Sequence, residues 1–285
     1  MSSLTPPMPS PPKRPIPPPP SVSPPKANGS TKRSFSVSKG RSVNAQKVVV
    51  YGPGGVGKTE LCSLAKEEGI NPLFLDIGNG TGFLNVDRIE GLETWEDLRD
   101  VLHDENLFSG YNAVVIDDLT KAEELATNYV IRTVPHEKEG RSIKSIEDYG
   151  WGKGATHVYE AFLNLLADLD NHVRKNRWVL CIAHDCTANV PNPSGEDWIR
   201  YEPRLQSPAS GKSSIRHRVK EWCDHLLFVG FDTAVNRDGK ATGGGTRTIY
   251  PSEMPTHWAK SRSLADPIYY EKGSSHLWKS LKEGH

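Results

Sequence analysis

The segment Gly52-Pro-Gly-Gly-Val-Gly-Lys-Thr59 constrains the fold of this 285-residue chain more than any other. It fits the pattern G-x-x-x-x-G-K-[ST] at every position. Residues 47–51 before it form a short β-branched run typical of a buried strand, and residues 58–67 after it carry apolar side chains at helical spacing. A strand, a glycine-rich turn and a helix in this order predict a loop whose backbone N–H groups surround a phosphate group.

The side chains of this loop indicate which phosphate compound it holds. Lys58 supplies a mobile positive charge suited to the β- and γ-phosphates, and the Thr59 hydroxyl is a hard oxygen ligand suited to Mg²⁺. We therefore expect ATP and Mg²⁺ as cofactors. The predicted nucleotide contacts are Gly52, Pro53, Gly54, Gly55, Val56, Gly57, Lys58 and Thr59.

Polar residues stand at the ends of three further predicted strands: Asp76, the pair Asp117 and Asp118, and His184. In an open parallel sheet these are the carboxyl ends, where ligands bind. We expect Asp117 to hold the magnesium shell together with Thr59. Asp118 is either the base that orients the attacking water or a helix cap. His184 is either a sensor of the γ-phosphate or a structural residue.

The remaining pattern predicts an α/β fold. Strands are expected at 47–51, 72–77, 113–117, 178–183, 225–231 and 246–250, and helices at 58–67, 94–102, 121–134 and 155–175. Residues 135–154 and 187–220 are predicted to be loops, and Asn236-Arg-Asp-Gly239 is typical of a hairpin turn. Strands that alternate with helices indicate a doubly wound, mostly parallel sheet with flanking helices, here followed by a C-terminal β-hairpin.

The first 46 residues differ in composition from the rest of the chain. They hold seven basic side chains and no acidic one, and 12 of the 22 prolines lie between Pro6 and Pro25. Such a segment cannot bury enough apolar surface to offset its chain entropy. We predict a disordered, basic, proline-rich tail at 1–45, a nucleotide-binding domain at 46–272 and a C-terminal tail at 273–285.

The composition also excludes several classes of protein. The longest apolar run covers only residues 178–183, whereas a membrane-spanning helix needs about 20 apolar residues. The N-terminus lacks the apolar core of a secretory signal. Four cysteines are too few for a disulfide scaffold, which favours a reducing, cytoplasmic location without membrane contact.

A basic cluster precedes the fifth predicted strand. Residues 199–220 hold six basic side chains against the single acid Glu202, and Trp198 and Tyr201 lie beside them in the sequence. Cations that follow the phosphates and rings that stack on bases suit single-stranded DNA, whereas a solvated loop is the simpler interpretation. The predicted DNA contacts are Arg200, Tyr201, Arg204, Lys212, Arg216 and Arg218.

Taken together, these motifs resemble those of the RecA-like P-loop ATPases of phages, including the single-strand annealing type, over about residues 46–272. The resemblance rests on Gly52–Thr59, Phe74-Leu-Asp76, Val114-Val-Ile-Asp-Asp118, Asp148-Tyr-Gly-Trp-Gly152, Ile182-Ala-His184 and Ala259-Lys-Ser-Arg262. It implies a RecA-like fold that forms rings or filaments with ATP between subunits. It also implies that 135–154 and the interval after the fourth strand face DNA, and that a single-strand-binding protein is a further partner.

The resemblance assigns two roles to residues outside the phosphate loop. Lys260 and Arg262 match a late lysine and arginine that reach the γ-phosphate bound by a neighbouring subunit. The catalytic glutamate of such proteins has no counterpart, because Gly78 stands at its position. Asp76 or Asp118 substitutes for it, or ATP acts mainly as a ligand for assembly.

The sequence thus predicts an ATP- and magnesium-dependent ATPase that binds single-stranded DNA and promotes annealing or recombination in a self-assembled form. If a phage encodes it, the cytoplasm is that of the bacterial host. Two alternatives stay open: an ATPase accessory to DNA replication or packaging, and an annealing module that uses ATP only for assembly.

Overall fold

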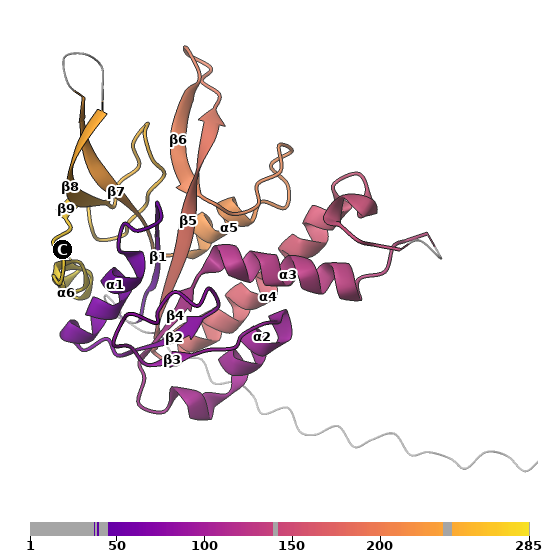
Figure 1. Ribbon diagram of the computed structural model, residues 1–285, viewed down its shortest axis with the longest axis horizontal. Coiled ribbons are helices and arrows are strands. Elements are labelled where there is room, and N and C mark those ends of the chain that lie inside the picture. Colours follow the sequence, from indigo (N-terminus) through magenta and orange to yellow (C-terminus); the bar gives the residue numbers. More distant parts are fainter. Residues whose placement is uncertain (1–36, 38, 40–44, 139–141, 236–240, 285) are drawn as a thin grey trace, which may run out of the picture. The chain divides into compact units, whose positions relative to one another are not determined.

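Figure 1 shows the computed structural model, which describes residues 37, 39, 45–138, 142–235 and 241–284, the last two ranges with backbone alone at 233–235 and 241–244. Nearly all of the predicted tail 1–45 lies outside the described residues, and so does the predicted turn at 236–239. Ala45 is buried, and it belongs to a compact unit that extends to the C-terminus.

Nine strands among the described residues form one sheet. They are β1 (Lys47–Gly52), β2 (Pro72–Asp76), β3 (Arg88–Ile89), β4 (Ala113–Asp117), β5 (Trp178–Val190), β6 (Trp198–Pro203), β7 (His225–Val235), β8 (Ala241–Tyr250) and β9 (Ile268–Tyr269). Eight of them follow the order β3-β2-β4-β5-β1-β7-β8-β9, and β6 pairs with β5 outside this order. The strands from β3 to β7 in this order are parallel. Strand β8 pairs antiparallel with β7. The predicted α/β class with a mostly parallel sheet and a C-terminal hairpin is confirmed.

The helices flank this sheet (Figure 1). They are α1 (Lys58–Ser63), α2 (Trp95–His103), α3 (Leu119–Thr133), α4 (Lys153–Arg174), α5 (Ile215–Trp222) and α6 (His276–Glu283), with 3-10 turns at Leu64–Glu68, Glu105–Phe108 and Ile146–Tyr149. Thr94 caps α2 in a capping box with Asp97, as its sequence pattern predicts. Within the part of the chain that the structure describes, no helix is long and apolar enough to cross a membrane.

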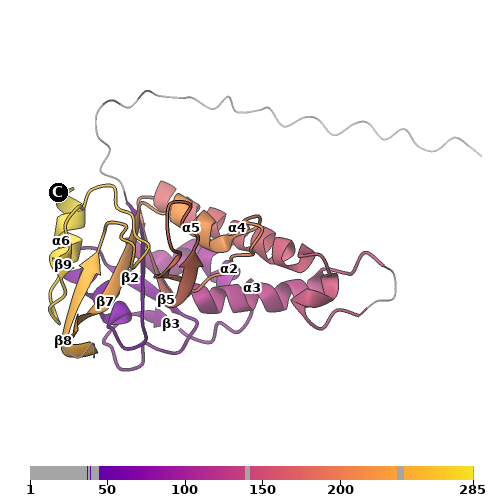
Figure 2. The ribbon, with the colours of Figure 1, turned by 90° about the horizontal axis from the view of Figure 1, so that it is seen from above.

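Alternating side chains of the central strands pack against two different groups of helices. In β1, Val49 and Tyr51 join a core formed with α2, α3, α4 and α5, whereas Val48 and Val50 join a core formed with α1 and α6. Figure 2 shows α6 on one side of the sheet and α2, α3, α4 and α5 on the other. Because successive side chains of a strand point to opposite faces, both faces of the central strands are buried. The phosphate loop therefore emerges from a fully packed strand.

The prediction of a loop over 187–220 is wrong. Strand β5 continues to Val190 and pairs antiparallel with β6, and α5 follows at Ile215–Trp222. Figure 1 shows the β5–β6 hairpin extending beyond the main sheet. Its residues alternate between exposed and partly buried positions, and the exposed ones include Thr187 and Asn189. Because many side chains of this two-stranded ribbon are polar, its sequence lacks the alternation of apolar and polar residues from which a strand is predicted.

Residues 273–284, which the sequence predicts to be a tail, are part of the folded domain. Helix α6 buries Leu277, Trp278 and Leu281 against the α1 side of the sheet. Trp278 is fully buried, and its indole N–H donates to the carbonyl of Leu61 at 2.6 Å. An amphipathic helix of eight residues after a run of glycine and serine is too short for its periodicity to be recognised in the sequence.

Candidate nucleotide-binding site

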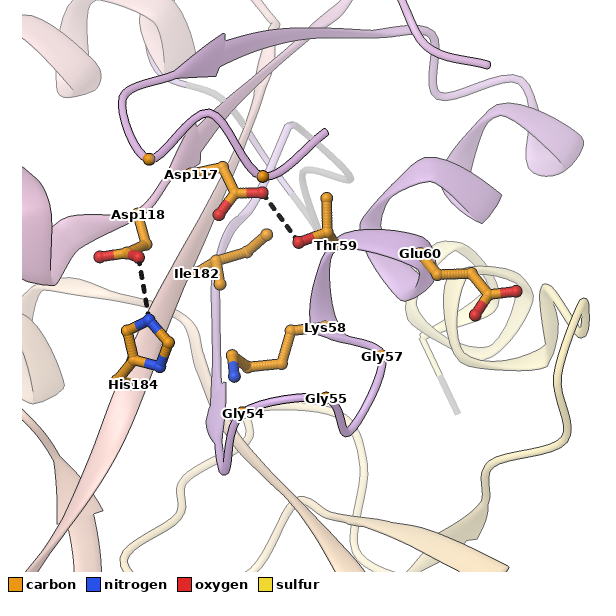
Figure 3. A pocket seen from close by; sticks show the side chains of 12 residues that line it. Gly54, Gly55, Gly57, Lys58, Thr59, Glu60, Asp117, Asp118, Ile182 and His184 are labelled. Atoms are coloured by element: carbon orange, nitrogen blue, oxygen red, sulfur yellow. Dashed lines mark hydrogen bonds and ion pairs between the residues drawn. The ribbon is translucent and has the colours of Figure 1, made fainter. Parts of the chain in front are cut away.

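A pocket of about 310 Å³ opens at the carboxyl ends of β1, β4 and β5 (Figure 3). Its volume lies in the range of small-molecule sites. It is lined by Gly54, Gly55, Gly57, Lys58, Thr59, Glu60, Gly78, Gly80, Asp117, Asp118, Ile182 and His184. Topology thus brings the predicted phosphate loop together with the polar ends of two other strands.

Gly52 shows why the loop must begin with glycine. A Cβ atom at this position would lie 2.1 Å from the carbonyl oxygen of Val229 in β7. The backbone also has φ of 155°, where side chains are strained. The loop can leave β1 in this direction only because no side chain is present.

Lys58 folds back over the loop. Its side-chain amine donates to the carbonyls of Gly52 at 2.8 Å and Pro53 at 2.9 Å, and the residue is only 7% exposed. Burial lowers the pKa of Lys58, and the carboxylates of Asp185, Asp118 and Asp117 act in the opposite direction. A buried ammonium group that faces an open pocket suits an anionic ligand.

Thr59 and Asp117 meet at one corner of the pocket. The Thr59 hydroxyl donates to Asp117 Oδ2 at 2.8 Å (Figure 3). Burial raises the pKa of Asp117 to about 6, the Thr59 hydrogen bond opposes this, and the nearby Asp118 and Asp76 raise it further. Hard oxygen ligands beside a concentration of negative charge fit a magnesium ion.

Asp118 is a helix cap, and it also contacts His184. Its Oδ1 accepts a hydrogen bond from the backbone N–H of Lys121 at the start of α3, and its Oδ2 lies 3.3 Å from His184 Nε2. Burial lowers the pKa of His184, although the Asp118 charge opposes this. Asp118 and His184 therefore form a pair at the pocket wall (Figure 3).

Asp76 is engaged in holding the loop that follows β2. Its Oδ1 accepts from the N–H of Gly80 at 2.9 Å, and its Oδ2 accepts from both the N–H and the hydroxyl of Thr81. The residue is 2% exposed and does not line the pocket. Gly78, at the position of the missing glutamate, does line it.

Lys260 and Arg262 lie at the opposite edge of the sheet from the pocket of the same chain. Lys260 forms a bridge with Leu226 at the start of β7, and its amine donates to the carbonyls of Lys220 and Cys223 at the end of α5. Arg262 contacts Asp224 at 3.0 Å and has a side chain that is 66% exposed. Only assembly could bring Arg262 to a pocket, so its role across subunits stays a prediction.

Two of the six predicted DNA contacts form ion pairs with a buried glutamate. Glu202 lies between Arg200 at 2.7 Å and Arg216 at 2.6 Å, and the two arginine side chains are only 15% and 14% exposed. Arg200 also contacts Glu253. These arginines fasten the β5–β6 hairpin to α5 and to the loop that holds Glu253, and most of their charge is compensated within the chain.

The other four predicted DNA contacts are exposed: Tyr201, Arg204, Lys212 and Arg218. Tyr201 stacks on Phe228 with ring centroids 5.3 Å apart. Arg204 lies at the base of the hairpin, where its N–H donates to the carbonyl of His184 at 2.8 Å. Their exposure is compatible with DNA contact and does not test it.

The prediction missed Trp151 as a candidate functional side chain. It is fully exposed and has a φ of 51°, between Gly150 and Gly152, which also have positive φ. A bulky residue in this conformation is rare. The exposed indole stands just before α4, whose first turn is hydrogen-bonded to the loop of Lys212 through Thr156 and Ser213. The signal in the sequence was a tryptophan between two glycines.

Comparison with known proteins gives the family. Residues 44–263 match the AAA domain family. The protein belongs to this family. No curated protein matches its sequence. The match covers the whole phosphate loop and every residue of the pocket, and membership in a family of P-loop ATPases implies nucleotide binding, typically with Mg²⁺.

This AAA domain protein also matches solved structures, all distantly. The flagellar accessory protein FlaH from Methanocaldococcus jannaschii has 9% identity and a TM-score of 0.39, over 73% of this chain and 77% of the other. The RadB recombinase has 14% identity and a TM-score of 0.38, over 79% and 86%. An ATPase from the type III secretion system of pathogenic bacteria has 11% identity and a TM-score of 0.36, over 68% and 53%.

Proposed function

We propose that this AAA domain protein binds ATP and Mg²⁺ in the pocket at the phosphate loop, and that nucleotide binding controls its contact with single-stranded DNA during annealing or recombination. The observation that carries the proposal is the meeting of Lys58, Thr59 and Asp117 in one pocket. Lys58 would contact the phosphates, and Thr59 and Asp117 would hold the metal. The metal, when bound, would neutralise charge that develops on the phosphates.

Asp118 and His184 are the groups proposed to assist hydrolysis. Asp76 has both carboxylate oxygens occupied by the loop after β2, so it is not free to orient water. Asp118 keeps one oxygen directed at His184, and both residues line the pocket. A histidine held in orientation by a carboxylate can position a water molecule or contact the γ-phosphate.

His184 is also the proposed connection between the pocket and the DNA. It lies in β5 where that strand leaves the main sheet to pair with β6. Its carbonyl accepts from the N–H of Arg204, and its own N–H donates to the hydroxyl of Thr120 at 3.3 Å. A shift of His184 toward a bound nucleotide would therefore act directly on the base of the β5–β6 hairpin.

The DNA surface proposed here combines Trp151 with the exposed cations Arg204, Lys212 and Arg218. An exposed indole can stack on a base, and the cations can follow the phosphates. The Gln206 side chain donates hydrogen bonds to the carbonyls of Ala155 and Ser213, which connect the loop that holds Lys212 to the first turn of α4. Because stacking and phosphate contacts carry little sequence information, we expect no sequence preference.

The test measures binding of a fluorescent single strand with and without ATP and Mg²⁺. Lys58→Ala removes a charged hydrogen bond to phosphate, so we expect nucleotide affinity to fall by about tenfold or more and the effect of ATP on DNA binding to disappear. The matched control is Lys66→Ala, an exposed lysine beyond α1. Failure of the wild-type protein to bind the strand under every condition would contradict the DNA part of the proposal.

A second function is favoured by Gly78 and by the engagement of Asp76. With Gly78 in place of the glutamate and both oxygens of Asp76 engaged, ATP would serve as a ligand for assembly, and annealing would proceed without turnover. Annealing that persists while hydrolysis stays at background would select this alternative. Vigorous turnover that is independent of DNA would instead favour an accessory ATPase of replication or packaging.

A further inference from the structure

Two side chains from the C-terminal part of the sheet hold the end of the phosphate loop from outside. Arg247 of β8 donates from Nη1 to the carbonyl of Val56 at 3.0 Å. The hydroxyl of Tyr270, just after β9, donates to the carbonyl of Gly57 at 3.0 Å. The N–H of Tyr270 donates to the carbonyl of Arg247 at 2.8 Å, so the two residues form one unit.

This unit is packed tightly against the loop at Gly57. A Cβ atom at Gly57 would lie 2.8 Å from Arg247 Nη1 and 2.9 Å from the Tyr270 hydroxyl. Tyr270 is only 5% exposed, and the Arg247 guanidinium lies over the rings of Phe231 and Tyr270, at 5.7 and 5.6 Å from their centroids. Both donors are therefore held in place, and the glycine is required for their approach.

The geometry of the peptide bond gives these contacts a consequence inside the pocket. In a trans peptide the carbonyl and the following N–H point in opposite directions. The carbonyl of Val56 shares a peptide with the N–H of Gly57, and the carbonyl of Gly57 shares the next with the N–H of Lys58. Together with the N–H of Leu61, which donates to the Gly57 carbonyl at 2.8 Å, these contacts hold both carbonyls outward and so fix the direction of both N–H groups, which belong to residues that line the pocket.

The Tyr270 donor keeps its proton under ordinary conditions. Burial raises the pKa of Tyr270 to about 12, so the phenol stays protonated and its hydrogen bond does not depend on pH near neutrality.

We propose that Arg247 and Tyr270 are positioning residues for the nucleotide, which keep the N–H groups of Gly57 and Lys58 directed at its phosphates. The inference rests on the nucleotide site of the proposed function and is independent of its DNA part. It links the C-terminal hairpin, which the sequence places far from the phosphate loop, to the affinity for nucleotide.

The test compares Tyr270→Phe with Tyr269→Phe by titration calorimetry against Mg–ADP and Mg–ATP. Tyr270→Phe removes one hydroxyl and keeps the buried ring, whereas Tyr269 is 59% exposed and serves as the matched control. The loss of one hydrogen bond predicts a rise in Kd of about fivefold for Tyr270→Phe, similar for both nucleotides. Arg247→Met, which removes a charged donor, should raise Kd at least as much, and Tyr269→Phe should leave it unchanged.

Thermal unfolding of the same variants without nucleotide separates positioning from stability. A Tyr270→Phe protein with a lower Tm but the wild-type Kd, measured where it is fully folded, would overturn the inference, because Tyr270 would then be purely structural. Wild-type protein that binds no nucleotide would overturn both the inference and the proposed function. Wild-type binding with an unchanged Kd in Tyr270→Phe overturns only the inference.

Discussion

Individual residues in this protein resolve the cost of burying charge in different ways. Lys58 and Asp117 are buried at the pocket, and the nearby groups compensate them only in part, as the raised pKa of Asp117 indicates. Glu202, in contrast, is buried between two arginines that satisfy it fully. Incomplete compensation is typical of a site that awaits a ligand, whereas a complete network is typical of a structural role.

His225 is a buried residue with a testable effect on stability. Its Nδ1 contacts the Ser261 hydroxyl at 2.7 Å and its Nε2 contacts Gln46 Oε1 at 2.6 Å. Burial lowers its pKa to about 4, with Asp224 opposing and Arg262 and Lys260 adding to the shift. The folded state therefore binds fewer protons than the unfolded state between pH 6.5 and 4, and stability falls as the pH falls through this range.

We expect this residue alone to account for about 3 kcal/mol of stability lost between pH 7 and pH 4. The measurement is urea unfolding at several pH values for the wild type and for His225→Gln, which cannot titrate. The variant should show a weaker dependence on pH. His276→Gln, at an exposed position, is the control. Parallel pH profiles for the wild type and His225→Gln would contradict the assignment.

At the scale of elements, the β5–β6 hairpin depends on electrostatics for its position. Glu202 connects β6 to α5 through Arg216, and Glu253 connects Arg200 and Lys220 at the edge of the same network. The hydroxyl of Tyr51, directly before the phosphate loop, shares its proton between the carbonyl of Trp258 at 2.5 Å and the carbonyl of Tyr201 in β6 at 3.0 Å. The hairpin is thus attached both to α5 and to the strand that carries the nucleotide loop.

Removing the Glu202 charge should weaken the attachment of the β5–β6 hairpin to α5. Glu202→Gln leaves the largely buried Arg216 without a counter-ion and leaves Arg200 with Glu253 alone, so we expect the free energy of unfolding to fall by about 3 kcal/mol. Chemical denaturation measures the change. Glu221→Gln, whose carboxylate is exposed and 3.8 Å from Arg218, should behave like the wild type. A wild-type stability for Glu202→Gln would show that hydrophobic contacts alone hold the hairpin.

At the scale of the whole molecule, Lys58 is the only lysine or arginine among the described residues that line the pocket. The amine of Lys260 donates hydrogen bonds to carbonyls at the end of α5, whereas the side chain of Arg262 contacts Asp224 and is otherwise exposed. If subunits assemble with one pocket against the opposite edge of the next, Arg262 is the better placed of the two to reach a neighbouring nucleotide.

We therefore expect Arg262→Ala to reduce hydrolysis by about tenfold or more with little change in Tm, because a cation supplied from a neighbour stabilises charge in the transition state. Lys260→Ala should lower Tm instead. Mixing Arg262→Ala with Lys58→Ala subunits should restore activity, since some interfaces would combine an intact pocket with an intact arginine. Mixtures that stay inactive would argue that Arg262 acts within its own chain or has no role.

The sequence by itself determined the phosphate loop, the parallel strands other than β3 and the positions of Asp117, Asp118 and His184, because these follow from local pattern and from the rule that parallel strands share a carboxyl edge. Only the tertiary structure decided which charged side chains are free. Arg200 and Arg216 seemed as available as Lys212 until the pairing of β5 with β6 placed Glu202 between them. The contacts of Arg247 and Tyr270 with the phosphate loop depend likewise on side chains separated by about 200 residues in the sequence, and no local pattern encodes such contacts.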